Sequence, residues 1–226
     1  MMRKFAKWHI WLGWLVGVPI VMWTATGLFM VAKPIEQVRG EHLRIESEPT
    51  PLVLPDSEIA SEEAQLREMR VTMQDGRAVA ILTTLDGMSS RIDMASGAPI
   101  APVDAQDARA IAAERIVGGD DVRAVTFFEA SEVPFDFRRP KPVWQVALTD
   151  GTHVYVGRDT GEIEAVRTTW WRWFDFMWGL HIMDLSERED TSHPILILFA
   201  ALALTGAMIG CILMFRRRKA RIKADA

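Results

Sequence analysis

Three of the five histidines lie at or near the two long uncharged stretches of the chain: His9, His181 and His193. A neutral imidazole is a good ligand of haem iron. An ionisable side chain inside a membrane is costly unless it has a function. We therefore interpret these three histidines as candidate cofactor-binding residues, with iron as the metal they would hold.

Small residues follow His9 on one helical face. His9, Gly13 and Gly17 are spaced by four residues, so they form a single row on a helix. Two explanations of this groove remain open: close packing of another helix, or space for the flat face of a porphyrin that His9 ligates. Gly206 and Gly210 form a second pair with the same spacing. We predict that both pairs pack helices.

His181 lies in an unusually aromatic segment, residues 168–185. The aromatic side chains of this segment are Trp170, Trp171, Trp173, Phe174, Phe176 and Trp178. Charged residues lie among them, a composition typical of a helix in the membrane interface. Pro194 suits the first position of the next helix. Structural roles also explain the two histidines, His193 as a helix cap and His181 as a polar residue bonded to Asp184 or water.

The two uncharged stretches, residues 8–32 and 194–215, are both long enough to cross a membrane. A helix rises about 1.5 Å per residue, so about 20 residues span the hydrocarbon core. The first stretch is longer than the apolar region of a cleaved signal peptide, which favours an uncleaved span. From His9 to residue 32 the rise is roughly 35 Å. His9 and His193 therefore belong to opposite membrane edges and cannot ligate one iron.

Basic residues lie in the two terminal segments of the chain, before the first span and after the second. They are Arg3, Lys4 and Lys7 before the first span, and Arg216, Arg217, Arg218, Lys219, Arg221 and Lys223 after the second. The positive-inside tendency predicts that both termini are cytoplasmic and that the middle is periplasmic, in a bacterial inner membrane. With nine of 26 basic residues in the tails and 29 of 30 acidic residues between them, the middle has a net charge of about −12. Nucleic acid is therefore excluded as an expected partner.

The middle of the chain contains a repeat with an offset of 64 residues. Arg77, Val79, Asp86, Gly87 and Gly97 match Lys141, Val143, Asp150, Gly151 and Gly161. Each copy predicts a strand, an Asp-Gly turn, a second strand, and a Ser-Gly or Thr-Gly turn before a third short strand. Residues 104–117 predict an amphipathic helix before the second copy. The first copy has at best a short helix near residues 55–66.

The expected fold class is a membrane anchor of two transmembrane helices with an extracytoplasmic α+β domain, a helix on an antiparallel sheet. Its expected segments are a cytoplasmic tail (1–7), a span (8–32), a degenerate first repeat (33–103), a second repeat (104–167), an aromatic interfacial helix and loop (168–192), a span (193–215) and a basic cytoplasmic tail (216–226).

The remaining histidines and the single cysteine carry weaker signals. His42 and His153 lie in the middle, and His153 alternates with Val154 and Val156 as a solvated residue on a sheet face would. Cys211 lies near the inner end of the second span, so the middle can form no intrachain disulfide. We interpret Cys211 as a small apolar packing residue.

The second repeat resembles the PepSY module. The matching part is a helix, a strand at residues 122–129, and then "KPVWQVALTDGTHVYVGRDTGEIEAV", in which the Trp144 position and the Asp150-Gly151 turn are specific. The flanks "RKFAKWHIWLGWLVGVPIVMWTATGLFM" and "WWRWFDFMWGLHIMDLSEREDTSHPILILFAALALTG" resemble the membrane segments of PepSY-associated transmembrane proteins. The PepSY resemblance implies two PepSY-like repeats in this chain.

Larger proteins of this family include inner-membrane ferric-siderophore reductases with b-type haem between their helices. The resemblance therefore implies haem b on His9 and on His181 or His193, an electron donor, and a ferric chelate as acceptor. The chain would then be a haem-dependent component of a transmembrane ferric reductase. Those larger proteins have at least four spans, so we expect a homodimer or a helical membrane partner to complete the bundle.

A non-catalytic function is the alternative. PepSY modules also occur as inhibitors or chaperones of secreted peptidases, so the resemblance also allows a membrane-anchored module that binds or regulates such a partner. The sequence contains no HExxH, GxSxG or GxGxxG motif, which gives no sign of a hydrolase or of a nicotinamide site.

Overall fold

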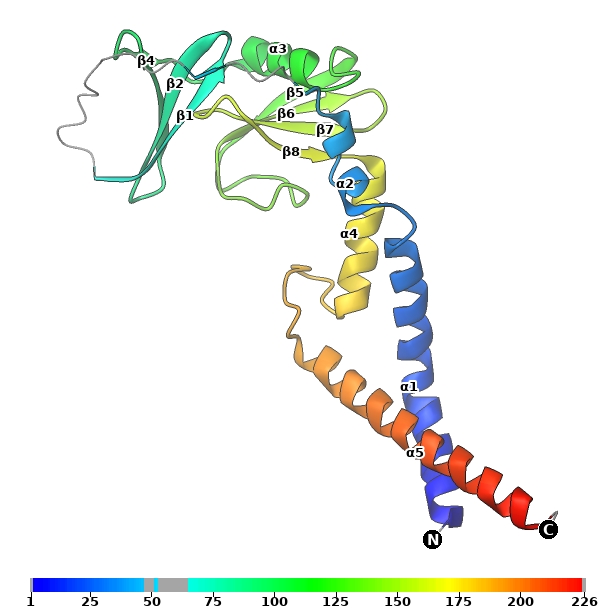
Figure 1. Cartoon of the computed structure of the whole chain (residues 1–226). Coiled ribbons are helices and arrows are strands. Elements are labelled where there is room, and N and C mark those ends of the chain that lie inside the picture. The colour runs from blue at the N-terminus through cyan, green and yellow to red at the C-terminus, as the bar shows by residue number, and fades with distance from the viewer. Residues whose placement is uncertain (1, 47–50, 53–64, 225–226) are drawn as a thin grey trace. The chain divides into compact units, whose positions relative to one another are not determined.

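The computed structural model describes residues 2–46, 51–52 and 65–224. The chain divides into two compact units, which are described separately. The membrane unit comprises Met1–Pro34 and Arg172–Ala226, and the sheet unit comprises Ile35–Trp171. Both units are drawn in Figure 1.

The membrane unit consists of helices. They are α1 (Met2–Met30), the part of α4 (Thr169–Ile182) from Arg172 onward, and α5 (Pro194–Ala224). Lys4–Met30 and Pro194–Phe215 are long and apolar enough to cross a membrane, in agreement with the two predicted spans. Helix α1 ends two residues before the predicted limit, in a turn before Pro34, because proline has no N–H to donate to the Met30 carbonyl oxygen. Helices α1 and α5 cross with the two chain ends at the same end of the pair (Figure 1).

The sheet unit contains two antiparallel sheets with the same strand order. The first consists of β1 (Leu66–Gln74), β2 (Arg77–Thr84), β3 (Ser89–Asp93) and β4 (Pro99–Ile100). The second consists of β5 (Val122–Phe128), β6 (Val143–Leu148), β7 (His153–Gly157) and β8 (Ile163–Arg167). Strands β7 and β8 begin 64 residues after β3 and β4, which is the offset that the sequence predicted.

The first strands of the two sheets, β1 and β5, are not related by the 64-residue offset. Strands β1 and β2 are joined by Asp75 and Gly76, both with positive φ (50° and 73°), as in the tight turns that match strand twist. Strands β5 and β6 are instead separated by residues 129–142. An ungapped comparison therefore could not align β1 with β5, and the sequence did not predict β1. Most of the short helix expected near residues 55–66 lies outside the described residues, and Leu66 begins β1.

Helix α3 (Ala105–Arg115) packs on the second sheet. Asp104 caps it by accepting hydrogen bonds from the backbone N–H groups of Gln106 and Asp107. Ala108 and Ala112 are fully buried against a core that includes Val146, Val154, Val156 and Val166. The predicted amphipathic helix is thus present, and its small alanines allow close approach to the sheet.

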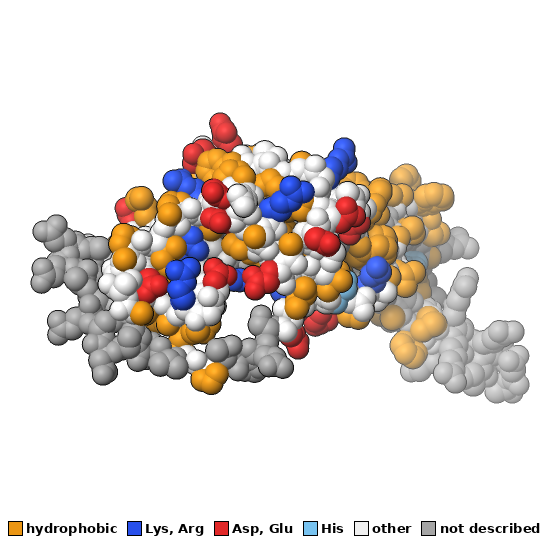
Figure 2. All heavy atoms as spheres, turned by 90° about the horizontal axis from the view of Figure 1, so that it is seen from above, with side chains coloured by type: hydrophobic (Ala, Val, Ile, Leu, Met, Phe, Trp, Pro, Cys, Tyr) orange, Lys and Arg blue, Asp and Glu red, His pale blue; other side chains and the backbone are white. Residues whose placement is uncertain are grey.

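Two short segments precede the first sheet, α2 (Ile35–Val38) and a 3-10 turn at Glu41–Leu43. Gly40 has φ +74°, and a Cβ there would lie 2.8 Å from Val166 Cγ1, so glycine is required where this segment crosses β8. Acidic and basic side chains are interspersed on the face of the sheet unit drawn in Figure 2.

Candidate functional site

His9 lies against α5 within the membrane unit. Its Nδ1 is 3.1 Å from the carbonyl oxygen of Gly206. A carbonyl oxygen can only accept, so Nδ1 carries the proton of the neutral ring and Nε2 carries the lone pair. A ring fixed by Nδ1–H to a backbone carbonyl is the arrangement commonly found in metal-ligating histidines.

The two glycine pairs have different surroundings. A Cβ at Gly210 would lie 2.8 Å from His9 Cε1, and one at Gly206 would lie 3.8 Å from Leu12 Cβ. These two glycines therefore make room for α1 within the same chain. Apart from the backbone of α1 itself, no atom of the described residues lies within 4 Å of the Cβ positions of Gly13 and Gly17.

The open glycine pair lies in a groove along α1. The groove has a volume of about 770 Å³ and an almost wholly apolar lining. The residues that line it are His9, Ile10, Gly13, Trp14, Gly17, Val18, Val21 and Met22. It leaves space beside His9 for another helix or for a flat ring, the two explanations that the spacing allowed.

His181, in the last turn of α4, lies against the other end of α1. Its Nδ1 is 3.0 Å from Thr26 Oγ1, and Trp23 Nε1 donates to its carbonyl oxygen at 2.5 Å. The Thr26 hydroxyl also lies within hydrogen-bond distance of two carbonyl oxygens, those of Met22 at 2.8 Å and Trp23 at 3.1 Å. A hydroxyl that donates to either carbonyl accepts from His181 Nδ1–H, an arrangement that leaves the His181 lone pair on Nε2.

The two imidazoles are far apart. Thr26 follows His9 by 17 residues of the same helix, a rise of about 26 Å. One metal ion cannot bridge that distance. Histidine sites at two ends of the span are what the sequence predicted, and the structure brings His181 to the end opposite His9.

His193 immediately precedes α5. Its carbonyl oxygen accepts from Ile197 N at 3.2 Å, which places the backbone of His193 at the start of the helix. Among the described residues, its buried Nδ1 has no hydrogen-bond partner. The side chain therefore does not cap the helix, contrary to the capping role considered from the sequence.

Asp184 does not pair with His181, contrary to the alternative considered from the sequence. Its carboxylate accepts from the backbone N–H groups of Ser186, Glu187, Glu189 and Asp190. It also accepts from the Ser186 hydroxyl at 2.8 Å. The Ser186 hydroxyl and these N–H groups hold the pKa of Asp184 well below its ordinary value of 3.8.

An ion pair closes the same loop onto α4. Arg188 Nη1 lies 2.6 Å from Asp175 Oδ2, and both side chains are largely buried. Trp178 Nε1 donates to the Arg188 carbonyl oxygen at 3.1 Å. The loop between α4 and α5 is thus fixed by side chains, which sets the positions of His181 and His193 at its two ends.

His153 in the sheet unit is less solvated than its alternation pattern indicated. Its side chain is 28% exposed, and its Nδ1 lies 3.1 Å from Asp136 Oδ2. Tyr155 donates its hydroxyl to Asp136 Oδ1 at 2.5 Å and accepts from Gln145 Nε2 at 2.6 Å. Burial, followed by the Asp136 contact, raises the pKa of Tyr155 above its ordinary value of 10.0.

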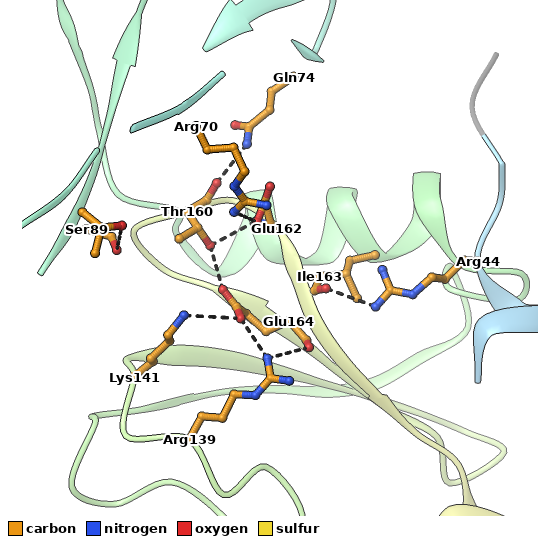
Figure 3. A network of polar contacts seen from close by, with 11 residues as sticks. Arg44, Arg70, Gln74, Ser89, Arg139, Lys141, Thr160, Glu162, Ile163 and Glu164 are labelled. Atoms are coloured by element: carbon orange, nitrogen blue, oxygen red, sulfur yellow. Dashed lines mark hydrogen bonds and ion pairs between the residues drawn. The ribbon is translucent and has the colours of Figure 1, made fainter. Parts of the chain in front are cut away.

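A polar cleft lies between the two sheets (Figure 3). Its volume is about 480 Å³. Arg70 of β1 pairs with Glu162 at 2.5 Å, and Gln74 Nε2 donates to the Thr160 carbonyl oxygen at 2.9 Å. Glu164 lies between Arg139 at 3.3 Å and Lys141 at 3.7 Å. The contacts of Arg70 and Gln74 join the two sheets, and the charged side chains line a mixed-charge surface.

Sequence reasoning missed the partners of the candidate histidines. Trp23, Thr26 and Gly27 form the surface of α1 that receives His181, with a Cβ at Gly27 in ordinary contact at 3.6 Å from His181 Cε1. Their three- and four-residue spacing indicates that they share one face of α1. Nothing in the sequence indicates which helix packs on that face. Cys211 is exposed on α5, and His42 lies in the 3-10 turn.

The number of metal-binding side chains that lie together limits the kind of metal site that the protein can form. Within the described ranges, no group of three or more His, Cys, Asp or Glu side chains is arranged to hold a metal ion. A haem iron needs only axial ligands from the protein, because the porphyrin supplies the other four. The single, separated imidazoles fit that requirement.

Comparisons with known proteins agree with the membrane architecture. No curated protein and no solved structure matches the chain. The family described as the PepSY-associated TM region matches residues 6–225, nearly the whole chain. A matching family and two helices able to span a bilayer identify a membrane protein. The chain belongs to the family of PepSY-associated transmembrane proteins.

Proposed function

We propose that the protein is a haem-b-binding, transmembrane electron-transfer component that supports reduction outside the cytoplasm, for example of ferric chelates. In this proposal the two sheets are PepSY-like repeats on the periplasmic side of a bacterial inner membrane, and both termini are cytoplasmic. Bound haem would supply one-electron redox chemistry at each end of the span.

The observation that carries the proposal is that two separated histidines each contact an oxygen atom through Nδ1. In His9 and His181, the Nδ1–H is held by an oxygen acceptor, Gly206 O or Thr26 Oγ1. Each hydrogen bond fixes the ring and leaves Nε2 as the basic nitrogen. Ligating histidines need this combination, because the second nitrogen sets the orientation and basicity of the first.

The residues around the two rings would orient them and exclude water. Gly210 allows the His9 edge to approach α5 closely, and Trp23 holds the backbone of His181. His193, which immediately precedes α5, has a buried Nδ1 without a hydrogen-bond partner in the part of the chain that the structure describes. It is therefore the candidate for a second ligand in addition to His181. His9, His181 and His193 are thus the proposed iron ligands, the same three histidines that the sequence indicated.

The open groove of α1 supports a second copy or a helical membrane partner. Two spans alone cannot enclose a porphyrin, and no described residue of the single chain covers the face that contains Gly13 and Gly17. A homodimer packed on this face would form a four-helix bundle with His9 at its interior edge.

The test is the absorbance spectrum and haem content of the purified full-length protein from haem-replete cells. We expect a low-spin b-type spectrum that is lost or shifted toward high spin in His9→Ala and His181→Ala. His193→Ala tests the second ligand at the His181 end. His153→Ala is the matched control, because His153 bonds to Asp136 in the sheet unit. A colourless wild type would contradict the proposal.

The polar cleft favours the alternative of a non-catalytic, membrane-anchored module. Arg70, Glu162 and Glu164 present mixed charge between two sheets, a surface suited to a protein partner such as a secreted peptidase (Figure 3). A colourless protein that co-purifies with a periplasmic partner, and loses it in Arg70→Ala, would support this function instead.

A further inference from the structure

Four arginines and a tryptophan meet in one pocket of the sheet unit. Arg39, Arg44, Arg139, Arg167 and Trp171 line a space of about 790 Å³. Three glutamates line it as well, and one of them, Glu164, is already ion-paired with Arg139 at 3.3 Å. In a middle with a net charge of about −12, such a gathering of guanidinium groups needs an explanation.

The pocket is built by close packing. Val38 is 1% exposed, and Gly40 packs on Val166 where no side chain would fit. Arg44 Nη2 donates to the Ile163 carbonyl oxygen at 3.2 Å (Figure 3). The segment that carries Arg39 and Arg44 is thus fixed against β8, the strand that carries Arg167.

Trp171 is held by cations. Arg167 Cζ lies 4.2 Å from the centre of the Trp171 ring, and Arg138 Cζ lies 5.9 Å from it. Arg167 Nε donates to the Asp136 carbonyl oxygen at 2.8 Å, which fixes its guanidinium beside the ring. Arginine next to an aromatic ring is a combination that recognises phosphate groups. The chemistry of the pocket is therefore that of phosphate recognition beside an apolar ring.

Chain connectivity relates this pocket to the spans. Arg39 follows the end of α1 by only nine residues, and Trp171 is the third residue of α4, the aromatic helix that continues into the membrane unit. Tryptophan and arginine are the residues typically found where a chain meets lipid headgroups. A pocket for a soluble anion would not need to lie so close in the sequence to the membrane-spanning helices.

We propose that the pocket binds the phosphate of an anionic phospholipid headgroup, with Arg39 as the donor and Trp171 at the level of the glycerol. This interaction ties the sheet unit to the bilayer surface independently of any cofactor. Arg39 is an exposed residue of the pocket lining, so we expect its replacement to leave the fold unchanged.

The test is hydrogen exchange of the full-length protein in a nonionic detergent during titration with a short-chain phosphatidylglycerol. We expect exchange to slow in residues 38–46 and 163–171. Arg39→Gln should raise the midpoint of this effect about fivefold, since an arginine near an anionic surface contributes about that factor. Arg109→Gln, an exposed arginine on α3, is the matched control and should leave the midpoint unchanged.

A second titration distinguishes a phospholipid headgroup from free phosphate as the ligand. Inorganic phosphate at the same concentration should give no protection, because it lacks the apolar part. Equal protection by inorganic phosphate would assign a free-anion site and overturn the proposal. It would also be overturned by absence of protection, or by equal midpoints for Arg39→Gln and wild type. Unchanged exchange of Arg39→Gln without lipid establishes that the variant is folded.

Discussion

At the residue scale, the hydrogen-bond partner of each histidine decides what it can do. The sequence placed His9 in a row of small residues but could not show that Gly206 O would accept its Nδ1–H. It likewise offered Asp184 as a partner for His181, whereas the structure has Thr26 in that place. Helix spacing specifies a face, but the identity of the facing helix depends on tertiary packing.

The contact between His9 and α5 predicts different effects of two neighbouring substitutions. Gly210→Ala should displace the imidazole, because its Cβ would lie 2.8 Å from His9 Cε1. We expect a loss of about 1–3 kcal/mol in stability. Gly206→Ala is the matched control, with its Cβ at an ordinary 3.8 Å from Leu12 Cβ. Thermal unfolding in detergent checks this, and equal midpoints for the two variants would contradict the packing described.

Tyr155 is the single tyrosine of the chain, so its ionisation can be followed without interference from another phenol. Burial and Asp136 raise its pKa, so the neutral phenol is favoured in the folded state. The resulting stability is present below the unfolded pKa of about 10 and is lost as the pH rises above it.

We expect little phenolate absorbance from the folded protein at a pH just above 10, and ordinary titration after unfolding. Asp136→Asn should lower the pKa of Tyr155 by removing a neighbouring charge. Phenolate formation in the folded protein at the same pH as in the unfolded chain would show that Tyr155 is not buried in this network.

At the scale of elements, the loop between α4 and α5 depends on one carboxylate. The pKa of Asp184 is depressed, so its stabilising contribution is present above its ordinary value near 3.8 and is lost as the pH falls toward the folded-state pKa. Asp184→Ala removes the acceptor of four backbone N–H groups.

We expect Asp184→Ala to speed hydrogen exchange in residues 186–190 at neutral pH, and acid to have the same effect in the wild type after correction for intrinsic rates. Glu187→Gln is the control, because it removes a charge from the same loop and leaves the Asp184 contacts in place. Equal protection in Asp184→Ala and wild type would mean that the contacts of Arg188 with Asp175 and Trp178 are enough to hold the loop.

Local patterns predicted most elements well. The aromatic segment forms α4, and the strands of the second copy follow their alternation and their Asp-Gly turn. Strand β1 was missed because its exposed charges, such as Arg67 and Arg70, obscure the period of a half-buried strand. The joining of the two sheets through Arg70, Gln74 and Glu162 could not be predicted, since it depends on contacts far apart in the sequence.

At the scale of the whole molecule, the antiparallel crossing of α1 and α5 puts both chain ends on one side of the pair (Figure 1). The basic tails predict that this side is cytoplasmic. Alkaline phosphatase fused after Asp120 should therefore be active, and the same reporter at the C-terminus inactive. Activity at the C-terminus with none at Asp120 would reverse the orientation and exchange the inner and outer histidines.

The central claim is that electrons cross the membrane between the His9 end and the His181 end. The most direct measurement is made in sealed proteoliposomes, with a trapped ferric chelate and an impermeant reductant outside. We expect the wild type and His153→Ala to reduce the trapped chelate, and His9→Ala and His181→Ala each to abolish the reduction. Reduction by the wild type no faster than in protein-free liposomes, or at an unchanged rate in both variants, would contradict the account.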